Sequence, residues 1–230
     1  GGSTLDPSEE SLLARYDVVT LARRKYDDIG GDTWGALRAI NPDIEIYLYQ
    51  LGPASYDDAD RDGIEYLNNL GRWDVSRGHS MGSLHGDNPE LILLDSNGDY
   101  ITNPSYPREK FHDVGSVGYQ NYWVEATIHD LVNQPWTADG VYIDGCMMTR
   151  SNMGATPVLY PDDESWSSAM TDFVNAITAG LHGEGMRVSC NRGDGKTDFG
   201  YSAWLELDGS PNPPDIVCDE GVFAVSWGTG

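Results

Sequence analysis

Two patterns of apolar residues alternate along this chain. Short apolar runs bounded by turn residues are typical of buried strands, and apolar residues spaced three or four apart are typical of helices. Strict alternation of the two predicts parallel strands joined by right-handed helical crossovers. The expected strands are 16–22, 45–50, 91–94, 140–143, 187–190 and 215–218.

Helices are expected near 33–40, where Asn41-Pro42 provides a stop, near 63–70 and near 124–132. The most regular helical stripe comprises Trp166, Met170, Phe173, Val174, Ile177 and Leu181. We interpret this stripe as core rather than as a cofactor site.

Parallel strands can form an open, doubly wound sheet or a closed barrel. The open sheet usually carries a glycine-rich phosphate loop after an early strand, and none follows the first or second strand here. Polar residues instead follow the strands, and at the mouth of a barrel such positions converge. The sequence therefore favours an α/β fold of the (β/α)8 TIM-barrel type, with 1–230 as one domain.

Only six β/α units are visible in the sequence, whereas a closed barrel needs eight. Either the last two units are missing, or another segment or chain supplies them, or the count of six is wrong.

The net charge of the chain limits the classes of partner that it can bind. Fourteen Lys and Arg against thirty-seven Asp and Glu give a net charge of −23, which argues against nucleic acid and membrane partners. The longest apolar stretches, such as Leu91–Leu94, are too short to span a bilayer. Gly1-Gly2-Ser3 reads as a trimmed end from which a signal peptide could have been removed, so we expect a secreted protein. An acidic surface suits salty water, although an ordinary acidic secreted protein is the alternative.

The three cysteines, Cys146, Cys190 and Cys218, match no zinc pattern. Each lies in or just after an apolar run, where a buried small hydrophobe is the usual role. A bridge between Cys146 and Cys190 is the alternative.

Two apolar runs end in carboxylates next to glycine: Gly140 to Asp144-Gly145, and Asp215 to Asp219-Glu220-Gly221. Cleavage of a glycosidic bond needs one carboxyl group that protonates the departing oxygen and a second that attacks the anomeric carbon or activates water. We assign Asp144 as nucleophile or base and Glu220 as acid, with Asp219 in reserve. The alternative is structural, because such an Asp can also cap a helix or pair with an arginine.

Three segments carry a family resemblance: "GVYIDG", "LILLDSNGDYI" and "VCDEGVF". In this order the chain resembles, from Tyr16 to Phe223, the hypothetical glycosyl hydrolase families of (β/α)8 proteins. It is also similar in layout to the α-galactosidase-like clans, which place a nucleophilic Asp on strand four and the acid on strand six. The resemblance implies a retaining glycoside hydrolase with Asp144 and Glu220 in these roles.

Supporting residues are expected around the two carboxylates. Trp204, Trp227 and Tyr49 lie near predicted strand ends or loops and could stack against sugar rings, although a core aromatic is the favoured interpretation of any single one. Hydrogen bonds to hydroxyl groups are expected from Gln50, Asp95 and Asn191. Arg23 and Arg192 suit an acidic or sulfated sugar, or neutralise Asp144.

No cofactor is expected. Asp58, Asp60 and Asp62 match the start of a calcium loop, but Asn69 stands where a bidentate Glu belongs. The expected partner is a carbohydrate, and the expected function is hydrolysis of a polysaccharide or oligosaccharide. A non-catalytic carbohydrate-binding barrel and a polysaccharide lyase are the alternatives.

Overall fold

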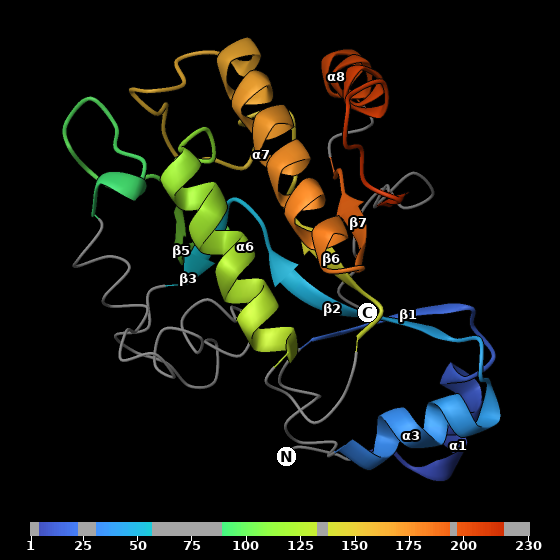
Figure 1. Cartoon of the computed structure of the whole chain (residues 1–230). Helices are drawn as coiled ribbons and strands as arrows, with labels where there is room; N and C mark the ends of the chain where they lie inside the picture. Colours follow the sequence, from blue (N-terminus) through green and yellow to red (C-terminus); the bar gives the residue numbers. More distant parts are fainter. Residues whose placement is uncertain (1–4, 23–30, 57–88, 133–137, 194–196, 219–230) are drawn as a thin grey trace.

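The computed structural model describes residues 5–22, 31–56, 89–132, 138–193 and 197–218. Its centre is a curled, all-parallel sheet that forms part of a barrel-like wall (Figure 1). The strands follow the order β1 (Val18–Ala22), β2 (Glu45–Leu51), β6 (Gly140–Asp144), β7 (Arg187–Asn191) and β8 (Ile216–Cys218). Five of the six predicted strands are therefore confirmed as parallel neighbours.

The prediction of a parallel strand at 91–94 is wrong. Pro89–Leu91 is a 3-10 helix, η3, and Ile92 and Leu94 form only isolated antiparallel bridges, to His112 and Tyr100. These residues lie beside a small antiparallel sheet of β3 (Ala54–Tyr56), β4 (Thr102–Asn103) and β5 (Tyr106–Phe111). As a result β2 pairs directly with β6, and Asp144 ends the third strand of the parallel sheet rather than the fourth.

Two long helices, α6 (Val117–Val132) and α7 (Asp163–Gly183), lie side by side over one face of the parallel sheet (Figure 1). Asp162 caps α7 by accepting a hydrogen bond from the backbone N–H of Ser165. The helices approach closely at Gly180, where a Cβ atom would lie 2.7 Å from a methyl carbon of Val124.

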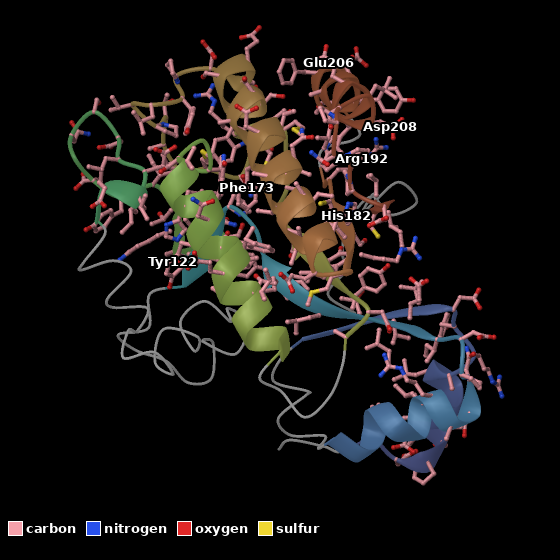
Figure 2. The ribbon with its side chains drawn as sticks, viewed as in Figure 1. Tyr122, Phe173, His182, Arg192, Glu206 and Asp208 are labelled. Carbon is pink, nitrogen blue, oxygen red and sulfur yellow. The ribbon has the colours of Figure 1, made fainter. Side chains whose placement is uncertain are left out.

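The predicted helical stripe of α7 is confirmed as core. All six of its residues are buried, and Phe173 packs between the rings of Tyr119 and Trp123 of α6 at centroid distances of 5.8 and 5.9 Å (Figure 2). Three shorter helices complete the described fold: α1 (Pro7–Leu13), α3 (Gly31–Ile40) and α8 (Asp198–Asp208). Among the described helices, none is long and apolar enough to cross a membrane.

The amino ends of the parallel strands are joined by charged side chains. Arg187 donates to both carboxylate oxygens of Glu45 at 2.6 and 2.8 Å, and Tyr47 donates to one of them at 2.9 Å. Burial and the neighbouring Glu45 raise the pKa of Tyr47. Asp215 accepts from the backbone N–H of Val188 at 2.7 Å, which ties β7 to the segment before β8. In barrels this end of the strands typically serves stability rather than chemistry.

None of Cys146, Cys190 and Cys218, which all lie in the described part of the chain, forms a disulfide bond. Cys146 and Cys190 are buried, in line with the prediction of small hydrophobes, and Cys218 is half-buried.

Candidate active site

Asp144 is the last residue of β6, and its half-buried side chain lies at the carboxyl end of the parallel sheet. Its carboxylate accepts hydrogen bonds from the Tyr49 hydroxyl, from the Asn191 side-chain amide at 2.8 Å and from the backbone N–H of Gly145 at 2.8 Å. Gly145 adopts a φ of +78°, which favours glycine and turns the chain away directly after the carboxylate. The described partners of Asp144 are therefore hydrogen-bond donors of the strand ends, and helix α7 is capped by Asp162 instead.

Asn191 reaches Asp144 from the neighbouring strand. It is the last residue of β7 and is buried, with 3% of its surface exposed. Its side-chain oxygen accepts from the backbone N–H of Gly193 at 3.2 Å, which leaves its amide group directed at Asp144. Asn191 thus joins two strand ends at the position where the sequence predicts hydrogen bonding to substrate.

Tyr49 reaches Asp144 from the other neighbouring strand. Tyr49 on β2 lies opposite Tyr142 on β6, and the two rings stack with centroids 5.9 Å apart and an interplanar angle of 23°. Because successive strand residues point to opposite faces, Tyr49, Tyr142 and Asp144 share the face that α6 and α7 do not cover. The sequence indicates Tyr49 only as a stacking aromatic. Its hydroxyl contact was missed because the β2–β6 register is not visible in the sequence.

Three loops meet around Asp144. The backbone N–H of Gly52, just after β2, donates to the Asp144 carbonyl at 2.9 Å. Gly145 packs near Pro53, and a Cβ atom at Gly193 would lie 3.5 Å from Met147. The loops that follow β2, β6 and β7 therefore contact one another where the carboxylate emerges.

Three other predicted site residues lie away from the Asp144 carboxylate. Gln50 is 1% exposed and donates to Thr127 of α6 at 3.0 Å, so it faces the helical layer. Trp204 is 4% exposed and lies on the buried face of α8, in the core. The Arg192 guanidinium lies over the ring of Tyr201 of α8 at 5.4 Å (Figure 2).

Asp95 occupies a surface turn rather than the end of a parallel strand. Its carboxylate accepts from the backbone N–H groups of Asn97 and Asp99 at 2.8 and 3.0 Å. These hydrogen bonds, the one from Asp99 foremost, lower the pKa of Asp95. Gly98 has a φ of +85°, so the predicted Asn-Gly turn is confirmed. Asp95 is therefore a turn-forming residue, and its assignment to the mouth of the parallel strands fails together with the predicted strand.

Several predicted residues lie outside the described part of the chain. They are Arg23, Asp219, Glu220, Trp227 and the calcium candidates Asp58, Asp60 and Asp62. Among the described residues, no group of three or more His, Cys, Asp or Glu side chains is arranged to hold a metal ion.

The sequence of the chain was compared with known protein families. The sequence profile of hypothetical glycosyl hydrolase family 15 matches residues 38–206, more than half of the 230 residues. The chain belongs to this family. Membership supports the prediction that the chain is a glycoside hydrolase, and the matched region contains Tyr49, Asp144 and Asn191. No curated protein sequence matches the chain.

Several solved structures are also similar to this family member. The cycloalternan-degrading enzyme from Trueperella pyogenes aligns with 15% identity and a TM-score of 0.44, over 69% of this chain and 21% of that one. A noncanonic maltogenic α-amylase, AmyB, from Thermotoga neapolitana aligns with 13% identity and a TM-score of 0.44, over 82% and 30%. Aspergillus fumigatus Ega3 in complex with galactosamine aligns with 13% identity and a TM-score of 0.42, over 77% and 52%. The chain thus spans about a fifth to a half of the length of these structures.

Proposed function

We propose that this family member is a retaining glycoside hydrolase that acts on a polysaccharide or oligosaccharide. Asp144 is the nucleophile and Glu220 is the general acid, with Asp219 as the reserve acid. The observation that carries the proposal is the Asp144 carboxylate, half-buried at the end of a parallel strand and held by donors from both neighbouring strands and from its own turn. Such a carboxylate is oriented before any substrate arrives, as an attacking group must be.

The strand order is compatible with a pair of catalytic carboxylates. Glu220 lies two residues beyond Cys218, the last residue of β8, and β7 alone separates β6 from β8. Neighbouring strands lie about 4.8 Å apart, so the backbones of β6 and β8 are roughly 10 Å apart. Carboxyl groups about 5 to 5.5 Å apart are typical of retaining enzymes, so this is the separation that the proposal requires between Asp144 and Glu220.

The proposed reaction has two steps. In the first, a lone pair of the Asp144 carboxylate attacks the anomeric carbon, the glycosidic C–O bond breaks, and the departing oxygen takes the proton of Glu220. In the second, Glu220 takes a proton from a water molecule whose oxygen attacks the same carbon, and the bond to Asp144 breaks with its electron pair returning to the carboxylate. Asn191 and the Gly145 N–H hold the carboxylate through both steps.

The proposal also includes a barrel fold and an extracellular location. The five parallel strands would form part of a (β/α)8 barrel, since the sheet curls and Tyr49, Asp144 and Asn191 meet at its carboxyl end, where barrel enzymes hold their active sites. The protein would act outside the cell, because large polysaccharides do not cross membranes.

A screen of algal, bacterial and plant glycans for released reducing ends tests the proposal. The Asp144→Asn, Glu220→Gln double variant is assayed beside the wild type, and the anomer released first is identified by NMR. We expect the wild type to release reducing ends with retained configuration and the double variant to release none. Equal release by the two proteins would refute the assignment, and an inverted product would refute the retaining mechanism.

The same screen separates the alternatives. A lyase would form unsaturated ends, and an Asp144→Ala variant would keep that activity. A non-catalytic binding domain would retain glycans in affinity electrophoresis without releasing any ends.

A further inference from the structure

We infer that Tyr49 is a catalytic residue that acts on the reacting oxygen of Asp144 and controls breakdown of the covalent glycosyl-enzyme. This inference rests on the proposed retaining mechanism. It follows from an asymmetry between the two oxygens of the Asp144 carboxylate, which the structure resolves through their hydrogen-bond partners.

Oδ1 of Asp144 is fully engaged. It accepts from the Asn191 amide and from the backbone N–H of Gly145, both at 2.8 Å. A carboxylate oxygen offers two lone-pair directions, so these two donors occupy both of them. Oδ1 is therefore the anchored oxygen, which keeps the carboxylate plane fixed.

Within the described part of the chain, Oδ2 has one hydrogen-bond donor where Oδ1 has two. Among the described residues, the Tyr49 hydroxyl is its hydrogen-bond donor. An oxygen with one donor and one open lone pair can attack an anomeric carbon without first losing a hydrogen bond. The geometry thus assigns Oδ2 as the nucleophilic atom and places the Tyr49 hydroxyl directly on it.

The position of the Tyr49 hydroxyl is fixed by the sheet. The Tyr49 ring stacks on Tyr142, its register partner, which lies two residues before Asp144 on the same face of β6. The parallel pairing of β2 with β6 therefore places the hydroxyl at Asp144 without help from a loop.

This hydroxyl acts oppositely on the two steps. When Oδ2 attacks, it loses negative charge, and a donor on Oδ2 loses part of its hydrogen bond as the ester forms. When water attacks the anomeric carbon, the C–Oδ2 bond breaks and its electron pair returns to Oδ2, where the hydroxyl stabilises the returning charge. Loss of the hydroxyl should consequently slow the second step without slowing the first.

The test is Tyr49→Phe, which removes the hydroxyl and keeps the stacked ring. Activity is measured on a panel of dinitrophenyl glycosides of hexoses and uronic acids, whose good leaving group makes the first step fast. A hydrogen bond to a charged group contributes about 1.5 to 3 kcal/mol, so we expect kcat to fall roughly 10- to 100-fold. We expect KM to fall with it and kcat/KM to change little, while a burst of dinitrophenol precedes the steady state and the glycosyl-enzyme accumulates in the intact-protein mass spectrum.

Tyr47→Phe is the matched control. Tyr47 lies on the same strand and the same face, but its hydroxyl donates to Glu45 at the amino end of the sheet. We expect this variant to lose some thermal stability and to show wild-type kcat, KM and burst. A fluorotyrosine at position 49 keeps the hydroxyl and changes its acidity, so it reports on the same step if Tyr49→Phe folds poorly.

The outcomes separate this inference from the proposed function. If Asp144→Asn is inactive while Tyr49→Phe and the fluorotyrosine variant turn over like the wild type without a burst, the role of Tyr49 is wrong and the hydrolase assignment stands. If Tyr49→Phe lowers kcat/KM as much as kcat and accumulates no intermediate, Tyr49 supports Asp144 only structurally. If Asp144→Asn keeps full activity, both proposals fall.

Discussion

Gly140→Ala tests the strand register that brings the candidate site together. Gly140 lies opposite Tyr47 on β2 and Arg187 on β7. A Cβ atom at this position would lie 2.4 Å from the Arg187 carbonyl oxygen and 2.6 Å from the nearest carbon of the Tyr47 ring. Tyr47 is fully buried, so neither the backbone nor the ring can yield without shifting a neighbouring strand.

The expected cost follows from this overlap. Overpacking a well-packed interior typically costs about 1 to 3 kcal/mol, and the double overlap with backbone and ring places this variant at the upper end. For a domain of this size each kcal/mol shifts Tm by roughly 2 to 4 °C, so we expect a loss of about 6 to 12 °C by circular dichroism.

Gly35→Ala is the matched control for this measurement. Gly35 lies inside helix α3, and a Cβ atom there would meet nothing within 4 Å. This variant should gain about 0.5 to 1 kcal/mol because alanine favours the helix. A Gly140→Ala variant as stable as the wild type would refute the register of β2, β6 and β7.

Three further predictions concern other parts of the fold and site. Trp204→Ala should lower the free energy of unfolding by about 3 to 5 kcal/mol in urea titrations, since Trp204 lies on the buried face of α8; a change below 1 kcal/mol would contradict its core position. Asn191→Ala should lower kcat roughly 10-fold or more with little loss of Tm, because Asp144 loses one donor; unchanged kcat would show that this contact is dispensable. Burial raises the pKa of Asp215. Hydrogen bonds from His182 and Val188, together with the charges of His182 and Arg187, outweigh burial and lower the pKa below 3.8. The ionised form is therefore stabilised on folding. The Tm advantage of the wild type over Asp215→Asn should be full at neutral pH and should shrink as the pH falls below 3.8; an advantage that grows in acid would reverse this assignment.

The regular elements were predictable because burial imposes a period on the sequence. The stripe from Trp166 to Leu181 identified α7, since its apolar residues fall on one face of a helix. The parallel strands were predictable because most of the residues in β2, β6 and β7 are buried, which favours nearly continuous apolar runs such as Val141 to Ile143.

The segment Leu91–Leu94 was predicted incorrectly, because its apolar pattern does not determine how it pairs. Leu91, Ile92 and Leu93 are buried, as in a parallel strand, but Leu93 donates a backbone hydrogen bond to Phe111 of β5, and Ile92 forms an antiparallel bridge to His112. A four-residue apolar run indicates burial without indicating its partner, because strand direction and pairing depend on residues far away in the chain. The predicted parallel strand at 91–94 and the placement of Asp95 were wrong for this reason.

The candidate site was predictable only in part. Asp144 could be identified because a carboxylate directly after a buried apolar strand costs desolvation free energy unless it is hydrogen-bonded or lies at the open end of the sheet. The sequence does not show which face of the sheet a residue at a strand end occupies. Gln50 and Arg192 were therefore assigned to the site, although they face the helices. The Tyr49 contact depends on the pairing of β2 with β6, which skips nearly ninety residues of chain.

The most direct test of the account compares two carboxylates at opposite ends of β6. Asp139, just before β6, bonds to Arg38 at 2.7 Å and to the backbone N–H of Ile46 at 2.8 Å, and we interpret it as structural. Reducing-end release is measured for Asp144→Asn and Asp139→Asn on the glycan that the wild type cleaves. We expect Asp144→Asn to lose at least about 1,000-fold in kcat with near-normal Tm, and Asp139→Asn to lose Tm with near-normal kcat. The reverse pattern, with full activity in Asp144→Asn, would contradict the assignment of Asp144 as the catalytic nucleophile.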